Sequence, residues 1–299
     1  VLDPRVDHAE GVVEDGAPGE DRVGELGVGR QVLPLRLAAD AAPAGESAVA
    51  AVIQSMHDVD EMMSTYKPAS QLSRVNDRAA QEPVKVDREL FEVIRNALEF
   101  SRLTHGAFDV TYASVGYLYD FRAHQRPTEA QIEKALPGIN WRNVRLDPVA
   151  LTVKFDHAGM RIDLGGIAKG YAVDRAIGLL QARGIAHAVV TAGGDSRIIG
   201  DRFGRPWSVG IRHPDDPKRV ITRIPLVDTA MSTSGDYERY FDENGVRYHH
   251  IIDPKTGHSA SKVRSATILA PTAMQTDGLS KTAFVLGAVT SGADPEQPL

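Results

Sequence analysis

The chain has 299 residues and no cysteine, which excludes disulfides and cysteine-ligated metal sites. Its formal net charge of −6 resides in residues 1–27, where eight acidic residues stand against two arginines, so residues 28–299 are balanced. A balanced body gives no electrostatic argument for binding nucleic acid. No apolar run approaches the roughly 18 residues that a membrane-spanning helix needs, so we predict no transmembrane segment.

The first half of the chain predicts one poorly ordered segment and several regular elements. Residues 1–30 are acidic and glycine-rich and lack hydrophobic periodicity, so we expect poor order there. They also lack the basic and apolar regions of an export signal. A short strand is expected at residues 31–37. Apolar residues recur at helical spacing in residues 45–63 and 87–104, and Thr128 is placed to cap a further helix.

The second half mixes strands and helices. Residues 144–163 alternate in runs that predict a hairpin and then a further strand, and a helix is expected over residues 165–184. "AHAVVTAGGD" predicts a buried strand that ends at a glycine pair. "WSVGIRHP", "VITRIPLVDTAMSTSG" and "RSATILAP" are strand-like, and "MQTDGLSKTAFVLG" predicts a helix. Because the elements follow no strict βαβ period, we predict an α+β fold with mixed sheets and flanking helices.

The stretch "DLGGIAKGYAVDRA" places an acid, two glycines and a lysine at the start of a predicted helix. The first turn of a helix has unpaired N–H groups and a positive dipole end, and glycines let a ligand approach the backbone. Such a turn suits a phosphate, with Lys169 as countercharge and Asp163 as acceptor for a sugar or ring N–H. On spacing alone, the commoner interpretation is a strand-to-helix corner with a solvated lysine.

Two further turns carry glycine, serine and acid after apolar strands. "TAGGDSR" spans residues 191–197 and "STSGDY" spans residues 232–237. Backbone N–H groups and hydroxyls in such turns can cradle phosphate oxygens. Hairpin turns are the commoner use of the same residues, so both interpretations stay open.

Polar side chains near the C-terminal end suggest acid–base or metal chemistry. In "YHHIIDPKTGH", His250 lies three residues before Asp253, and a histidine beside a fixed aspartate can act as a general base. A zinc site is not supported, because no ligand spacing of that kind follows. Asp277 opens the last predicted helix and could either favour its dipole or bind a hard cation such as Mg²⁺.

Seven motifs, spread over residues 45–287 in one order, resemble the ApbE family of FAD:protein FMN transferases. They are "MSTYKPASQLSRVN", "THGAFDVTYASVGYLYDF", "RIDLGGIAKGYAVDRA", "VVTAGGDSRIIG", "STSGDYERYF", "HHIIDPKTGHSA" and "SATILAPTAMQTDGLSKTAFVLG". The resemblance implies an ApbE-like (T-fold-like) architecture with a single domain over residues 31–287 and a C-terminal tail over residues 288–299, shorter than in relatives.

The resemblance also implies a reaction. FAD is bound with Mg²⁺, a Thr or Ser hydroxyl of an acceptor protein attacks the phosphorus on the FMN side, and AMP leaves. Such an in-line displacement depends on positioning and charge neutralisation. His250 is implied to assist proton removal, and the Gly166 carbonyl and the Asp277 carboxylate to bind the metal. The implied FAD contacts are Tyr66, Ala107, Phe108 (over the flavin ring), Asp109, Asp163, Lys169, Thr233, Ser234, Gly235 (a turn near the phosphates) and Ala260.

The chain departs from the family pattern at one implied metal ligand. Relatives carry a threonine four residues after the aspartate that matches Asp277, and here that position is Lys281. The i,i+4 spacing allows Asp277 and Lys281 to pair. An ammonium there would repel Mg²⁺, so we expect weaker metal binding than in relatives with threonine. The alternative is that Lys281 turns away and water replaces the hydroxyl. The family's N-terminal Met-Gly-Thr is also absent, which removes one implied FAD contact.

Three functions remain open on the sequence. The first is the transferase. The second is an FAD pyrophosphatase that gives FMN and AMP at the same site, and the third is a non-catalytic flavin-binding maturation factor. The resemblance implies a redox subunit as acceptor and, as in relatives, a location in the periplasm or at the outer face of the cytoplasmic membrane. No export signal is visible in this chain.

Overall fold

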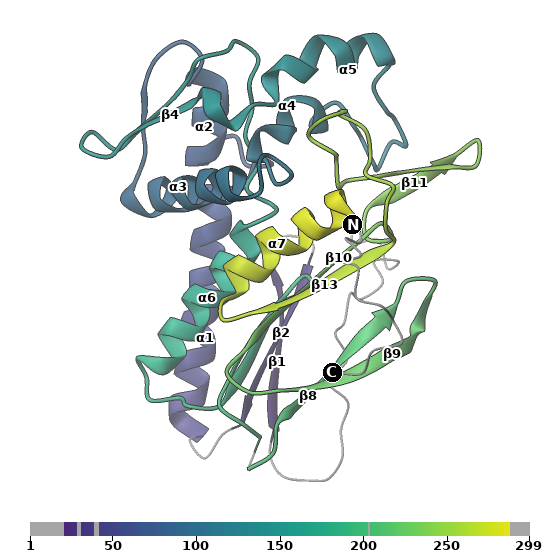
Figure 1. The fold of residues 1–299 in the computed structure, drawn as a ribbon. Coiled ribbons are helices and arrows are strands. Elements are labelled where there is room, and N and C mark those ends of the chain that lie inside the picture. The colour runs from purple at the N-terminus through teal and green to yellow at the C-terminus, as the bar shows by residue number, and fades with distance from the viewer. Residues whose placement is uncertain (1–20, 29–30, 39–41, 203, 288–299) are drawn as a thin grey trace.

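A six-stranded antiparallel sheet forms the centre of the molecule (Figure 1). The structure, a computed structural model, describes residues 21–28, 31–38, 42–202 and 204–287. Every neighbouring pair of strands in the sheet is antiparallel. In spatial order the strands are β1 (Asp21–Val28), β2 (Gln31–Ala38), β6 (Ala188–Ala192), β7 (Asp195–Ile199), β10 (Ala230–Gly235) and β13 (Ser265–Ala270).

The expectation of poor order over residues 1–30 is wrong for residues 21–28. These residues form β1, which pairs with β2 from Asp21 opposite Ala38 to Val28 opposite Gln31. A strand pair is held by backbone hydrogen bonds that any residue except proline can donate, so acidic and glycine-rich composition does not prevent it. Residues 1–20 and 29–30 lie outside the described residues, as does the predicted tail at residues 288–299.

Three long helices cover one face of the central sheet. They are α1 (Ala42–Met63), α6 (Ala168–Gln181) and α7 (Ala273–Leu286), and α7 crosses β10 and β13. Alternation along β6 sets this face: Ala188, Val190 and Ala192 join the core beneath the helices, whereas Val189 points to the opposite side.

A long hairpin packs on the opposite face of the sheet. Strands β8 (Trp207–His213) and β9 (Asp216–Leu226) place Trp207 and Leu226 against residues of the sheet. The sheet residues in this second core are Val189, Ile198 and Met231, the neighbours in sequence of residues that face the helices. The sheet is therefore buried on both sides.

A smaller helical region lies above the sheet and contains a three-stranded sheet of order β3–β5–β4. The N-cap prediction at Thr128 is confirmed, because Thr128 and Gln131 form a capping box. The elements of this region are α2 (Gln71–Arg78), β3 (Val84–Lys85), α3 (Arg88–Leu103), the 3₁₀ helix η1 (Val110–Tyr112), α4 (Ala113–Gly116), α5 (Glu129–Ala135), η2 (Leu136–Gly138), η3 (Trp141–Asn143), β4 (Val144–Asp147) and β5 (Thr152–Phe155).

The hairpin predicted within residues 144–163 is present as β4 and β5, but the further strand is not. Residues 160–164 form no strand, and the Asp163 N–H donates to the carbonyl of Val110 at 3.0 Å. The segment is instead an extended connection that delivers Asp163 to the start of α6. A single backbone hydrogen bond of this kind produces no periodic pattern in the sequence.

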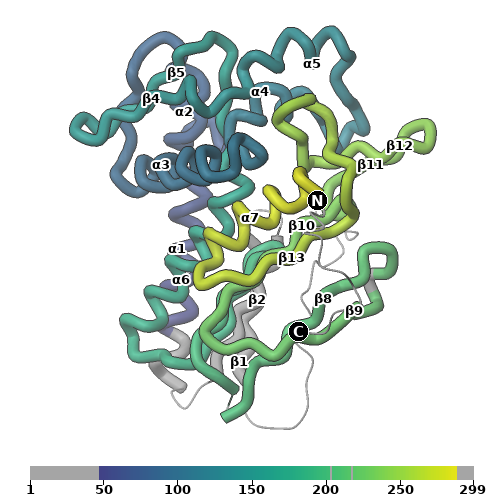
Figure 2. The backbone as a smooth tube through the Cα atoms, viewed as in Figure 1, coloured from purple at the N-terminus to yellow at the C-terminus, as the bar shows by residue number. Residues whose placement is uncertain are grey.

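The last small sheet pairs β11 (Tyr240–Glu243) with β12 (Val246–His249). Residues 250–258, which follow it, lie beside α5 although more than a hundred residues separate them (Figure 2). Tyr119 Oη donates to the Gly257 carbonyl at 3.0 Å, and Ile132 packs near Ile252 in the same cluster. This contact joins the helical region to the segment that follows β12.

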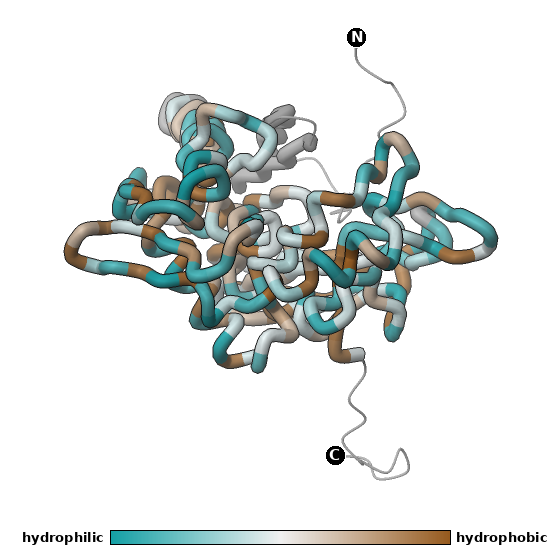
Figure 3. Tube along the Cα trace, turned by 90° about the horizontal axis from the view of Figure 1, so that it is seen from above, coloured by the Kyte–Doolittle hydropathy of each residue, from teal (hydrophilic) through white to brown (hydrophobic). Residues whose placement is uncertain are grey.

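Apolar residues recur through the middle of the molecule and hydrophilic residues occupy much of the outer loops (Figure 3). Among the described residues, no helix combines the length and the apolar character needed to cross a bilayer. The architecture of antiparallel sheets with helices on one face matches the predicted α+β class.

Candidate functional site

The chain turns sharply at Asp163, and a buried asparagine fixes that turn. Asn76 on α2 binds both backbone groups of Ile162, donating to its carbonyl at 2.9 Å and accepting from its N–H at 2.7 Å. Asp163 then accepts from Gly165 N at 2.6 Å and from Thr65 Oγ1 at 3.1 Å. The carboxylate is therefore held in place while Gly165 stays exposed. We call residues 163–167 the glycine corner.

The surroundings of the glycine corner are open and aromatic. The side chain of Tyr66, next to Thr65, is 75% exposed. Burial raises the pKa of the Tyr112 phenol, and the negative charge of Asp163 raises it further, so Tyr112 is a neutral donor near the acid. Two hollows on the described surface lie elsewhere, one around Arg74 and Asp87 and one around Trp141.

Helix α6 starts just after the corner and crosses α7 at very short range. A Cβ at Gly170 would lie 2.2 Å from the carbonyl oxygen of Ala273, so only glycine permits this approach. Asp174, one turn further along α6, accepts from the N–H groups of Ala273 and Met274, both at 2.9 Å. Arg197 on β7 donates to the same carboxylate at 2.7 Å. One aspartate thus fixes where α7 begins.

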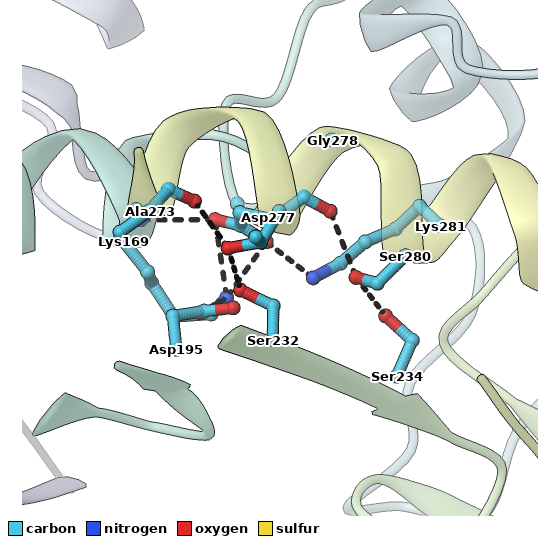
Figure 4. A network of polar contacts seen from close by, with 12 residues as sticks. Lys169, Asp195, Ser232, Ser234, Ala273, Asp277, Gly278, Ser280 and Lys281 are labelled. Atoms are coloured by element: carbon cyan, nitrogen blue, oxygen red, sulfur yellow. Dashed lines mark hydrogen bonds and ion pairs between the residues drawn. The ribbon is translucent and has the colours of Figure 1, made fainter. Parts of the chain in front are cut away.

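The crossing brings two acids and two lysines together (Figure 4). Lys169 Nζ lies 2.5 Å from Asp195 Oδ2 and 3.3 Å from Asp277 Oδ1. Gly170 N donates to Asp277 Oδ2 at 3.0 Å, and Lys281 donates to Asp277 Oδ1 from one turn further along α7. Asp195 and Asp277 are 1% and 0% exposed. We call Lys169, Asp195, Asp277 and Lys281 the ion network.

The charges of the ion network balance. Burial on its own raises the pKa of Asp277, but Lys169 and Lys281 outweigh it and the pKa is lowered. Burial lowers the pKa of Lys169, and Asp195 and Asp277 more than restore it, so it is raised. For Asp195, burial and the charge of Asp277 raise the pKa, and its Oδ1 is buried without a hydrogen-bond partner. Lys169 is therefore charged at neutral pH.

Residues Thr233, Ser234 and Gly235 do not form the predicted turn, because they lie on strand β10. Thr233 Oγ1 is 2.9 Å from Thr267 Oγ1 on β13, and Ser234 Oγ is 2.8 Å from Ser280 Oγ on α7. Buried hydroxyls satisfy one another here, which fastens α7 to the sheet. "TAGGDSR", in contrast, is a hairpin turn between β6 and β7, the commoner of its two interpretations.

The two adjacent histidines have different surroundings. His249 is fully engaged: its Nε2 lies 2.7 Å from the Ala260 carbonyl, and its Nδ1 accepts from Ile251 N at 3.3 Å. His250 Nδ1 is buried without a hydrogen-bond partner. Burial lowers the pKa of His250 well below its ordinary value, and the charges of Arg239 and Lys281 lower it further. His250 is therefore neutral at pH 7 with a ring nitrogen able to accept a proton.

Asp253 does not orient His250 in the predicted way. Its Oδ1 accepts from Lys255 N at 2.9 Å, and its carbonyl accepts from the N–H groups of Thr256 and Gly257. The carboxylate caps the turn that follows, as aspartate before proline commonly does. Because His250 Nδ1 has no partner, no hydrogen bond joins that nitrogen to Asp253.

Four predicted flavin contacts have buried side chains. Asp109 accepts from Thr111 N at 2.9 Å and from Trp141 N at 3.1 Å, so its carboxylate caps η1. Burial raises its pKa and these hydrogen bonds oppose the rise. Phe108 is 5% exposed and packs against Phe100 and the corner, so its ring belongs to the core and not to an open surface. Ala107 and Ala260 share a small buried cluster.

The predicted Mg²⁺ ligands are near each other, but the residues around them do not fit a divalent cation. Both Asp277 oxygens already accept from N–H groups, and two of these donors are ammonium groups. Gly166 lies beside the same lysine, because a Cβ at Gly166 would be 3.8 Å from Lys281 Cγ. Mg²⁺ requires about six oxygen ligands in near-ideal geometry, and it would have to displace a lysine to reach Asp277.

Asp195 was not predicted from the sequence as a site residue. It lies in the quoted motif "TAGGDSR", which drew attention to phosphate binding, but its pairing with Lys169 depends on a contact across 26 positions. An acid that follows two glycines at the start of a buried strand was the available signal. The Asp277–Lys281 contact was anticipated from the i,i+4 spacing, and the structure confirms it.

Comparisons with known proteins agree on one family. The model of the ApbE family matches residues 32–293. An FAD:protein FMN transferase of Vibrio cholerae is 36% identical over 241 residues, which cover 78% of this chain and 71% of the relative. One of Haemophilus influenzae is 35% identical over 78% of this chain and 70% of the relative.

Solved structures agree with the sequence relatives. The crystal structure of an ApbE protein from Thermotoga maritima superposes with a TM-score of 0.83 at 36% identity, covering 89% of this chain and 87% of that one. A flavin transferase ApbE from Vibrio cholerae superposes with a TM-score of 0.80 at 31% identity, covering 91% and 88%. The predicted ApbE-like architecture is therefore confirmed.

Proposed function

Because the chain belongs to the ApbE family, we propose that it is an FAD:protein FMN transferase, which moves FMN from FAD to a Thr or Ser hydroxyl of a separate acceptor protein. One observation carries the proposal within the structure. The glycine corner adjoins the buried ion network, because a Cβ at Gly166 would lie 3.8 Å from Lys281 Cγ and Lys169 follows the corner by two residues. An acceptor for a ring or ribose group and a source of positive charge therefore belong to one region.

Different residues have different roles in the proposed displacement at phosphorus. Asp163, held by Gly165 N and Thr65, orients FAD, and Tyr66 offers an exposed aromatic face beside it. Lys169 neutralises charge on the diphosphate, which is the main protein contribution in such reactions. Fixed donors act without reorganising during the reaction, and the tie to Asp195 and Asp277 fixes this lysine.

The proposed reaction begins at the acceptor hydroxyl. Its oxygen forms a bond to the phosphorus on the FMN side, the bond from that phosphorus to the bridging oxygen breaks, and AMP leaves with the electron pair. The hydroxyl proton goes to His250 Nδ1, the buried nitrogen that has no partner. The lowered pKa keeps the imidazole neutral at pH 7, as a general base must be before it takes up a proton, and makes it a weaker base than an exposed histidine.

The sequence resemblance implied Mg²⁺ as a further cofactor. The oxygens of Asp277 are already engaged by Lys169, Lys281 and Gly170, so these residues do not fit Mg²⁺, and the steps above depend on protein side chains. Two further parts of the proposal are a redox subunit as acceptor and a location in the periplasm or at the outer face of the cytoplasmic membrane. Fractionation of cells that produce the full-length protein checks the location.

Mass spectrometry of an acceptor tests the function. The protein is incubated with FAD and an acceptor domain that carries a flavinylation threonine, with and without Mg²⁺, and an acceptor with alanine at that position is the control. We expect the threonine acceptor alone to gain the mass of an FMN phosphoester. Release of FMN without labelling would instead identify a pyrophosphatase, and intact bound FAD would identify a binding factor.

A further inference from the structure

Lys281 occupies a position between buried acid and surface. Its side chain is 19% exposed, whereas the Asp277 side chain that it contacts is 0% exposed. Figure 4 shows Lys281 reaching back along α7 toward Asp277, with Lys169 arriving from the other side. The two ammonium groups therefore cover the buried carboxylate from two directions.

Lys281 also borders the glycine corner. The corner and Lys281 come from elements far apart in sequence, yet a Cβ at Gly166 would lie 3.8 Å from Lys281 Cγ. The side chain thus runs from the exposed corner to the ion network. A ligand that approaches the backbone of residues 165–166 would meet this lysine before it met Asp277, whose carboxylate is buried.

An ammonium group has three N–H donors. Lys281 gives one of them to Asp277. The remaining donors suit phosphate oxygens, because lysine binds phosphate as a compact point charge. The charge balance supports this use, since two acids and two lysines sum to zero and an added dication would lie beside two positive groups.

We propose that the ammonium of Lys281 binds the diphosphate of FAD together with Lys169, so that this chain binds FAD without a divalent cation. The inference rests on the proposed function and goes beyond it, because it assigns to a lysine of this chain the charge that a metal ion would bring. Asp277 then serves to hold the two lysines in place.

A purely structural role for Lys281 makes a different prediction. If the lysine only neutralises Asp277, its removal lowers stability and leaves the metal dependence of FAD binding as it was. If it binds diphosphate, its removal weakens FAD binding without metal, and an arginine restores that binding because it retains the charge. Thermal melting of each variant separates the loss of stability from the loss of affinity.

Equilibrium titration by quenching of flavin fluorescence tests the proposal. In EDTA, the wild-type chain should bind FAD with a Kd within about threefold of the value in Mg²⁺. Lys281→Met should raise the Kd in EDTA by about tenfold to a hundredfold, as expected for loss of a charged hydrogen bond. Lys281→Arg should stay within about threefold of wild type. Lys134→Met, at an exposed lysine of α5, is the matched control and should leave the Kd unchanged.

Direct binding of Mn²⁺ to the FAD-free protein gives a second measurement by electron paramagnetic resonance. Wild type should bind Mn²⁺ more weakly than Lys281→Thr, because the threonine removes an ammonium and adds an oxygen ligand. Wild type that binds FAD only with metal present overturns this inference, while FMN transfer to an acceptor under that condition would retain the proposed function. Absence of FAD binding in both EDTA and Mg²⁺ overturns both.

Discussion

The glycine corner and the ion network each contain an aspartate of the candidate site, and the two carboxylates have opposite surroundings. Asp163 is partly exposed and is oriented by one backbone N–H and one hydroxyl. Asp277 is fully buried and is surrounded by two ammonium groups and a backbone N–H. The first has room for a ligand, and the second already has its countercharges.

The largest effect should come from Asp277→Asn, which removes a buried negative charge from the ion network. The substitution leaves Lys169 and Lys281 facing an uncharged amide, and an uncompensated buried charge costs about 3–5 kcal/mol. We expect the free energy of unfolding in urea to fall by that amount. Asp242→Asn, in an exposed pair with Arg247, should cost less than about 1 kcal/mol. Equal losses would show that burial of the network contributes nothing.

Asp163→Asn tests the role of the exposed glycine corner in binding FAD. The two donors bind different carboxylate oxygens. The amide oxygen can still accept from Gly165 N, and the amide NH₂ can donate to Thr65 Oγ1 once that hydroxyl rotates, so we expect stability to change by less than about 1 kcal/mol. FAD affinity should fall by about tenfold to a hundredfold, since the charged acceptor for the ligand is lost. Fluorescence titration and urea unfolding measure the two quantities. Asp156→Asn, at an exposed acid paired with Arg145, is the control and should alter neither.

Gly170→Ala measures how tightly α6 and α7 pack where they cross. A methyl group 2.2 Å from the Ala273 carbonyl must push α6 and α7 apart, and such overpacking costs about 1–3 kcal/mol. Gly178→Ala on the same helix meets nothing within 4 Å, so it should stabilise the protein by about 0.5–1 kcal/mol. Melting temperatures of the pair should move in opposite directions, and a shared direction would contradict the close crossing.

The smallest effect concerns the pH dependence of stability. His250 has a lowered pKa in the folded state because it is buried and lies in the positive field of Arg239 and Lys281. The unfolded chain therefore takes up a proton first, and stability falls as pH drops below about 6.5, by about 1 kcal/mol at pH 5.5. His250→Gln should reduce this slope in urea unfolding at pH 5.5 and 7.5. His57→Gln in α1 should retain it.

Local signals predicted much of the fold. The capping box at Thr128, the glycine pair between β6 and β7 and the apolar spacing in α7 each act within a few residues, and each element is present. The family motifs also placed Asp163, Lys169 and Asp277 in one region, and the last two make direct contact. Patterns of this range need no knowledge of the tertiary structure.

Contacts between distant elements were harder to predict. Asp195 joins the site only because a β7 residue meets an α6 lysine. The resemblance implied that Phe108 covers a flavin ring, and the burial of Phe108 against Phe100 could not be predicted from its neighbours in sequence. Strand β1 escaped prediction because its backbone pairing with β2 is indifferent to its acidic side chains. In each case the deciding partner lies outside the local sequence window.

The cap that Asp174 provides for α7 has a consequence for biosynthesis. Its carboxylate lies on α6, its second partner Arg197 lies on β7, and the N–H groups of Ala273 and Met274 appear about a hundred residues later during synthesis. Until that helix emerges from the ribosome, the acid has only its arginine, and Lys169 has only Asp195. The nascent chain therefore cannot complete the ion network before α7 docks.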